Sequence, residues 1–135
     1  MTSVRPLLVV DAANVVGARP DGWWRDRPGA VRRLLDALGK GVPGGAEIVL
    51  VVEGAARPGV PATVVDGVRV VHASRSGDEE VVRIVAAAAK AEPGRPVTVV
   101  TADRELRDQV GALGAAPLGP GSLWEQLDRR RSSPT

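Results

Sequence analysis

Acidic residues follow four apolar stretches of this chain, and they are the side chains best suited to chemistry. Asp11 ends the run LLVVD, Glu53 ends IVLVVE and Asp103 ends VTVVTAD. Asp78 follows VRVVHASRSG, which is a fourth apolar stretch and a short loop. If these stretches are parallel strands, their carboxyl ends lie along one edge of the sheet, where such folds bind ligands. The spacing therefore predicts four carboxylates at one site.

Carboxylates gathered in this way repel one another. Two like charges about 4 Å apart repel by roughly 4 kcal/mol at an effective dielectric constant near 20, which is a large part of the stability of a small domain. Either some of the acids stay protonated or a cation lies among them. The chain has no cysteine, and its single histidine, His72, is expected inside a strand in a structural role. Oxygen ligands favour a hard ion, so we expect Mg²⁺ or Mn²⁺.

Helix capping is the alternative explanation for two of these acids. Asp78 and Asp103 both stand where a helix is expected to begin, and Asp is a favoured N-cap residue. Glu53 is harder to explain in this way, because the segment EGAARPGVP that begins with it is expected to be a loop. Capping and function therefore both stay open for Asp78 and Asp103 taken singly, and the predicted site depends on all four acids together.

Strands and helices that would position the acids alternate along the chain. The Val-rich, nearly continuous apolar stretches are typical of strands covered on both faces in a parallel sheet. We expect strands at residues 7–10, 48–52, 68–71 and 97–100, with a weaker fifth at 115–118, and helices at 28–39, 78–91, 103–114 and 122–130. Asp66 and Gly67 between two Val-rich runs predict a local antiparallel hairpin. The alternation predicts a three-layer α/β/α sandwich with a mainly parallel sheet of four to five strands.

Composition places limits on the class of protein. The 135 residues are 44% hydrophobic and 25% charged, which excludes global disorder. We expect one domain over residues 1–131 and a disordered tail over 132–135. The formal net charge of +2 permits an anionic partner without requiring one. No stretch is typical of a signal peptide or approaches the roughly 20 apolar residues that cross a bilayer, so we expect a cytoplasmic protein with no membrane contact.

Four short motifs carry a resemblance to a known family. They are VVDAAN from Val9, VVEG from Val51, GDEEVV from Gly77 and TADREL from Thr101. In this order they resemble the acidic motifs of the PIN-like nucleases, and in particular the NYN domains, including the YacP-like group, where an Asp-x-x-Asn motif ends the first strand. The resemblance covers about residues 6–119. It implies a PIN-like fold and metal-dependent endoribonuclease activity, with water hydrolysing the RNA phosphodiester bond to leave a 5′-phosphate and a 3′-hydroxyl.

The resemblance also implies roles for individual residues. Asp11 would be the central metal ligand, and Asn14 would orient a water or a phosphate. Glu53 stands where many relatives carry Asp, Glu79 would share or replace the role of Asp78, and Thr101 would form hydrogen bonds around the metal. The implied catalytic residues are Asp11, Asn14, Asp78 and Asp103, and the implied metal ligands are Asp11, Glu53, Asp78, Glu79 and Asp103.

The segment GARPDGWWRDRPG, from Gly17, is the predicted substrate-binding region. Arginine forks bind phosphate and tryptophan stacks on bases, a combination suited to single-stranded nucleic acid. The alternative is a tryptophan that packs the loop onto the sheet among solvated arginines; for Trp23 and Trp24 we expect one buried and one exposed. The run at residues 129–131 is expected to be a solvated basic segment. The predicted substrate-binding residues are Arg19, Trp23, Trp24, Arg25, Arg57, Arg75, Thr101 and Arg104.

Other functions are compatible with the same residues. A metal-dependent hydrolase of nucleotide pyrophosphates or other small phosphoesters would use the same acids. A non-catalytic RNA-binding or scaffold domain would keep the fold and lose the chemistry, and the modest net charge and Glu53 allow it. A stand-alone toxin nuclease is a further alternative at this length. The expected partner is RNA, single-stranded or structured, and the sequence leaves a homodimer open.

Overall fold

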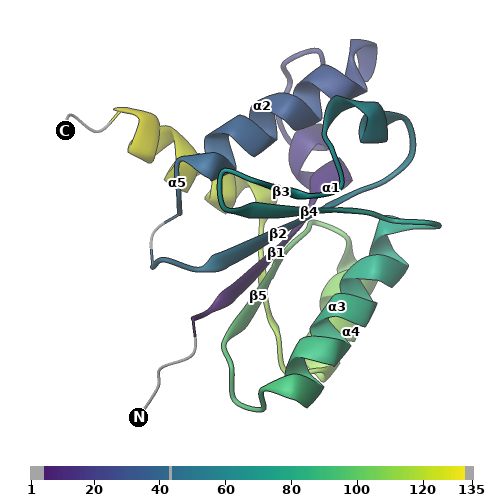
Figure 1. Cartoon of the computed structure of the whole chain (residues 1–135), viewed down its shortest axis with the longest axis vertical. Helices are drawn as coiled ribbons and strands as arrows, with labels where there is room; N and C mark the ends of the chain where they lie inside the picture. Colours follow the sequence, from purple (N-terminus) through teal and green to yellow (C-terminus); the bar gives the residue numbers. More distant parts are fainter. Residues whose placement is uncertain (1–4, 43, 133–135) are drawn as a thin grey trace.

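The computed structural model describes residues 5–42 and 44–132, which form a six-stranded sheet between two layers of helices (Figure 1). The strand order is β3-β4-β2-β1-β5-β6, and every neighbouring pair is parallel except β3–β4. The strands are β1 (Leu7–Asp11), β2 (Glu47–Val52), β3 (Val64–Val65), β4 (Val68–His72), β5 (Val97–Val100) and β6 (Ala116–Leu118). This confirms the predicted class and the antiparallel hairpin. The sheet has six strands instead of four to five because the short arm of that hairpin, β3, pairs as a strand of its own.

Side-chain hydrogen bonds cap the starts of several helices. The Asp26 side chain accepts a hydrogen bond from the backbone N–H of Gly29, and Ser76 does the same for Glu79. The helices are α1 (Ala12–Gly17), α2 (Arg27–Gly39), α3 (Gly77–Ala91), α4 (Arg104–Ala112) and α5 (Pro120–Ser132), with short 3₁₀ helices η1 (Trp23–Arg25) and η2 (Gly54–Gly59). Capping thus fixes the starts of α2 and α3, and the start of α3 orients the segment that carries Asp78.

Alternating side chains of the central strand divide the interior into two cores. Leu8 and Val10 pack with α1, α2 and α5, whereas Leu7 and Val9 pack with α3 and α4. In Figure 1, α2 and α5 lie above the sheet and α3 and α4 below it. Since both faces are covered, the parallel strands can be apolar along their whole length.

Three local features differ from the expectations or extend them. Helix α1 follows Asp11 directly and was not predicted, and the expected loop after Glu53 is the 3₁₀ helix η2. Helix α5 includes Ser132, which we expected in the tail, while residues 133–135 lie outside the described part of the chain. His72 lies in β4, and its Nε2 is 2.9 Å from the carbonyl oxygen of Val60, as a structural role requires.

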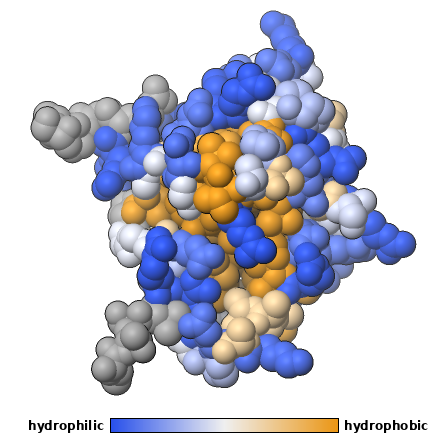
Figure 2. Space-filling model, in the orientation of Figure 1, coloured by the Kyte–Doolittle hydropathy of each residue, from blue (hydrophilic) through white to orange (hydrophobic). Residues whose placement is uncertain are grey.

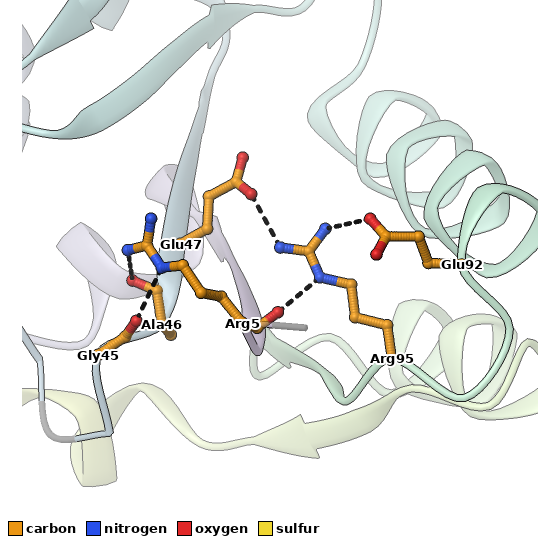
Figure 3. A network of polar contacts seen from close by, with 6 residues as sticks. All are labelled: Arg5, Gly45, Ala46, Glu47, Glu92 and Arg95. Carbon is orange, nitrogen blue, oxygen red and sulfur yellow. Dashed lines mark hydrogen bonds and ion pairs between the residues drawn. The ribbon is translucent and has the colours of Figure 1, made fainter. Parts of the chain in front are cut away.

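A polar network closes the amino ends of the three central strands (Figure 3). Arg95 donates hydrogen bonds to the backbone carbonyl of Arg5 at 2.7 Å and to the carboxylate of Glu47 at 2.8 Å. Its guanidinium also lies 3.8 Å from the carboxylate of Glu92, and its side chain is only 11% exposed. Arg5 in turn donates to the carbonyl groups of residues 45–46. The network joins the starts of β1, β2 and β5, at the end of the sheet opposite the four acids of the predicted site.

Apolar residues reach the surface on the side of the molecule where β3 and β4 lie (Figure 1, Figure 2). Figure 2 shows them in the middle of this face, with hydrophilic residues between and around them. Val64 of β3 is 63% exposed. Within residues 5–42 and 44–132, no helix has the length and apolar character needed to cross a bilayer.

Candidate active site at the carboxyl edge of the sheet

Asp11 is the last residue of the central strand β1 and is 1% exposed. Its Oδ2 accepts a hydrogen bond from Nδ2 of Asn14 at 2.6 Å and another from the hydroxyl of Thr101 at 3.1 Å. Its Oδ1 points the other way and lies 3.8 Å from where a Cβ on Gly77 would stand. One oxygen of this carboxylate is thus held by two donors, while the other faces the ends of β2 and α3.

The first turn of helix α1 explains the Asp-x-x-Asn spacing. Residues three apart on a helix lie on the same side, so Asn14 returns to the carboxylate that precedes the helix. The side-chain oxygen of Asn14 also accepts a hydrogen bond from the backbone N–H of Ala102 at 3.3 Å, and the hydroxyl of Thr101 accepts one from the N–H of Asp103 at 3.2 Å. Asn14 and Thr101 therefore fix the ends of β1 and β5 relative to each other, with Asp11 between them.

Glu53 and the start of α3 approach Asp11 from the side of β2. A Cβ on Gly77 would stand 2.7 Å from Oε1 of Glu53, so the absence of a side chain there makes room for this carboxylate. Gly77 is the first residue of the 15-residue helix α3, whose amino end carries partial positive charge. The glycine and the helix end together allow negative charge to collect between β1 and β2.

The pKa shifts show that the acids lie within one another's field. Burial is the main cause that raises the pKa of Asp11 above its ordinary value; the hydrogen bonds from Asn14 and Thr101 oppose the rise, and the charges of Asp78 and Glu53 add to it. Burial also raises the pKa of Asp78, followed in effect by three acidic neighbours, which are Asp103, Glu53 and Glu105. The structure thus brings together Asp11, Glu53, Asp78 and Asp103, which we call the acidic cluster.

Helix capping was the alternative explanation for Asp78 and Asp103, and it applies to Asp103 only. The side chain of Asp103 accepts a hydrogen bond from the N–H of Leu106 at 3.0 Å, so it is the N-cap of α4. Ser76 caps α3, which leaves Asp78 in the first helical turn with a carboxylate not used in capping. Asp103 therefore has a structural task in addition to its place in the cluster.

Two further acids lie beside the cluster. Glu79 is exposed and lines a hollow of about 450 Å³ together with Asp78 and Glu105. Glu79 is not among the groups that shift the pKa of Asp11 or Asp78, whereas Glu105 raises that of Asp78. Sequence reasoning missed Glu105, and the only available signal was its place two residues after Asp103 in TADREL.

The predicted aromatic region lies next to Glu53. Trp23 is half-buried against the core and Trp24 is 54% exposed, with their rings edge to face at a centroid distance of 5.9 Å. Arg25 lies 5.9 Å from the ring centroid of Trp24. Arg57 is exposed on η2 and donates to the carbonyl of Gly54. The prediction of one exposed tryptophan is confirmed for Trp24, whereas Trp23 is half-buried and not buried as expected.

The structure does not bring all the predicted arginines to this place. Arg19 pairs with Asp128 and lies 4.0 Å from the ring centroid of Trp124, so it holds α5 against the end of α1. Arg75 and Arg104 are exposed, Arg75 in the loop before α3 and Arg104 at the first residue of α4. Arg19 thus has a packing role that its position in the sequence did not indicate.

The donor chemistry of the cluster fits a hard divalent cation, although its side chains do not surround a common point. Carboxylate oxygens are the ligands that Mg²⁺ and Mn²⁺ take. Burial is the main cause that raises the pKa of Asp11 and of Asp78, and neighbouring carboxylates raise both further. In the part of the chain that the structure describes, no three acidic or histidine side chains are arranged to hold one ion.

Comparison with known proteins identifies the fold. No protein-family model and no curated protein matches the chain. Two solved structures of Rae1 (YacP) from Bacillus subtilis are similar to it. A mutant with a single substitution gives a TM-score of 0.77 at 16% identity, covering 94% of this chain and 77% of that chain. A second structure gives 0.72 at 18% identity, covering 93% and 75%. The chain therefore has a YacP-like fold.

Proposed function

We propose that this protein is a metal-dependent endoribonuclease that hydrolyses RNA phosphodiester bonds at the acidic cluster. One observation carries the proposal: acids from four separate segments gather at the carboxyl edge of one sheet, around the buried Asp11, whose Oδ1 lies beside Gly77 at the start of α3. The resemblance of the four acidic motifs to those of NYN domains and the YacP-like fold support the same assignment.

In this proposal Asp11 is the central ligand of Mg²⁺ or Mn²⁺, with Glu53, Asp78 and Asp103 around it. Bound there, the ion would act as a Lewis acid toward a phosphoryl oxygen and would lower the pKa of a water. The hydrogen bond from Asn14 favours the ionised form of Asp11, because a hydrogen bond to the charged form stabilises that form. With Thr101, Asn14 also turns Oδ1 toward the site. Asn14 and Thr101 thus position Asp11, the proposed metal ligand, and do not react themselves.

Cleavage of RNA by matched variants tests the proposal. The wild type should cleave an unstructured RNA with Mn²⁺ or Mg²⁺, and Asp11→Asn should lose more than about 100-fold of the rate, since even a residue behind a metal ligand is worth 10–100-fold. Asp36→Asn, which makes the same change on the exposed face of α2, should cleave as the wild type does. Equal cleavage by the wild type and Asp11→Asn would show that the acidic cluster is not the active site. A panel of nucleotide pyrophosphates and small phosphoesters distinguishes RNA from the smaller substrates.

A non-catalytic RNA-binding domain is the second candidate, and one observation favours it. The acidic side chains do not surround a common point in the described part of the chain. Metal titration separates the two functions, since a ligand at about 100 times its dissociation constant adds roughly 2.7 kcal/mol to the free energy of unfolding. A rise in melting temperature with Mn²⁺ in the wild type, absent in Asp11→Asn, supports the nuclease. RNA binding without that rise supports the second candidate.

A further inference from the structure

A hollow of about 360 Å³ lies beside the acidic cluster and shares Glu53 with it. One wall comes from α1, η1 and α2, with Val16, Trp23 and Val31 among its residues, and the other comes from η2 at residues 54–56. Arg27 lies at the same hollow, and its guanidinium is 5.6 Å from the ring centroid of Trp23. We call this hollow the Trp23 cavity.

The lining of the Trp23 cavity matches a flat aromatic ligand that is attached to a negative charge. Its volume lies in the range of small-ligand sites, and its walls combine aliphatic side chains, one indole and few polar groups. A base can stack on an indole whatever its sequence, because every base has a π face. Arg27 belongs to the cavity, and the exposed Arg57 follows its second wall, so a phosphate next to the base would meet positive charge.

We propose that the Trp23 cavity holds one unpaired nucleobase of the RNA, so that a neighbouring phosphate lies at the acidic cluster. The inference depends on the proposed function for the identity of the ligand as RNA. Glu53 carries the connection, because it lines the cavity and its Oε1 lies beside Gly77, which also adjoins Oδ1 of Asp11: a Cβ on Gly77 would stand 2.7 Å from the first oxygen and 3.8 Å from the second. A base within a duplex must leave its stack to enter such a pocket. The cavity therefore selects single-stranded RNA over duplex.

Two variants narrow the cavity from opposite walls and leave the acids themselves unchanged. Ala55→Leu adds volume on η2, and Ala13→Leu adds it on α1; both alanines are exposed and line the cavity. Ala86→Leu makes the same change on the exposed face of α3 and serves as the control. Thermal unfolding identifies which variants keep the wild-type fold, and those are carried forward.

Binding is measured without divalent metal, by fluorescence anisotropy of a labelled, unstructured RNA in EDTA. We expect each folded cavity variant to bind about tenfold more weakly than the wild type, which is the loss of one stacked base, while Ala86→Leu binds as the wild type. RNAs with a single abasic position complete the test. For the wild type, an abasic site at one position of the RNA should weaken binding by a similar factor. For Ala55→Leu, which already binds more weakly, the same abasic site should weaken binding little further.

The outcomes separate this inference from the proposed function. Cavity-dependent binding in EDTA, combined with no cleavage in metal, would support the base site and remove the nuclease. If the wild type cleaves RNA with metal, and if the wild type, Ala55→Leu and Ala13→Leu bind RNA equally well, the proposed nuclease stands and the base site is overturned. Equal affinity of the wild type for duplex and single-stranded RNA would also overturn it.

Discussion

Nδ2 of Asn14 donates a hydrogen bond to Oδ2 of Asp11 at 2.6 Å, and this places the two polar residues of the Asp-x-x-Asn motif in direct contact. The same amide accepts the backbone N–H of Ala102. Asn14 thus links the end of β1 to the loop after β5, and it does so around the most buried acid of the site.

Asn14→Ala should therefore lower activity without unfolding the protein. Asp11 would lose the first of the two hydrogen bonds that oppose the rise in its pKa, so less of it would be ionised and its orientation would be looser. We expect a 10–100-fold loss of RNA cleavage and of apparent metal affinity, as for other residues behind a metal ligand. Gln126→Ala on α5 is the control and should change neither. Activity of Asn14→Ala equal to that of the wild type would remove this residue from the mechanism.

Gly77→Ala tests whether space between the acids matters. The new methyl group would stand 2.7 Å from Oε1 of Glu53, so the flexible glutamate must swing away from Asp11. We expect the free energy of unfolding to change by no more than about 1 kcal/mol, because a helical alanine offsets part of the strain. The apparent affinity for Mn²⁺, measured from the rise in melting temperature, should fall about tenfold.

Gly111→Ala is the matched control for that change. This glycine lies in α4 and a Cβ on it would meet nothing within 4 Å. The substitution should stabilise the protein by about 0.5–1 kcal/mol, the usual difference between the two residues in a helix, and leave the response to Mn²⁺ intact. If Gly77→Ala kept the full response to Mn²⁺, Glu53 would not be a ligand.

The strands were predictable because their signal is local. β5 (Val97–Val100) has the predicted bounds, since a short Val-rich run between a Pro and a polar residue is evident without tertiary context. Helix α1 was missed because AANVVG is too short to show a helical period. Its apolar residues also continue the run of β1, so the boundary at Asp11 is marked only by a single acid.

The identities of the acids were likewise available in the sequence, but their partners were not. Thr101 contacts Asp11 across 90 residues of chain, a relationship that strand order creates and composition does not record. The same is true of Arg19, which a phosphate-binding pattern assigned to substrate and which the fold directs to Asp128, 109 residues away. Residue type thus predicted the chemistry of the candidate site, while long-range packing decided which side chains contact one another there.

Arg95→Met should destabilise the protein without affecting the acidic cluster. The nearly buried guanidinium donates hydrogen bonds to the backbone carbonyl of Arg5, just before β1, and to the carboxylate of Glu47 at the start of β2. Hydrogen bonds of charged groups are worth about 1.5–3 kcal/mol. We expect the free energy of unfolding in urea to fall by about 2 kcal/mol. Arg83→Met removes an arginine that is 72% exposed, so its change should stay below about 1 kcal/mol. A loss of the Mn²⁺ response in folded Arg95→Met would contradict the separation of the two ends of the sheet.

The metal-free protein should become less stable as the pH rises through the range just above 3.8. Burial raises the pKa of Asp11 and Asp78 above that ordinary value, so in this range the folded protein holds protons that the unfolded chain has lost. The contribution of these groups to the free energy of unfolding therefore falls with increasing pH and stays low at neutral pH. Asp78→Asn removes one of them and should stabilise the metal-free protein at neutral pH, with an advantage that shrinks toward about pH 4.

Urea unfolding in EDTA across this range measures the effect, with the exposed Asp36→Asn as the control expected to show no such pH-dependent advantage. Mn²⁺ should reverse the order at neutral pH, because a cation that binds only the folded wild type stabilises it by mass action, whereas Asp78→Asn lacks a ligand. A wild type more stable than Asp78→Asn in EDTA at neutral pH would mean that Asp78 already has a compensating partner in the fold. The amino end of α3 would then already offset the charge of Asp78, with no unmet charge left there to attract a metal.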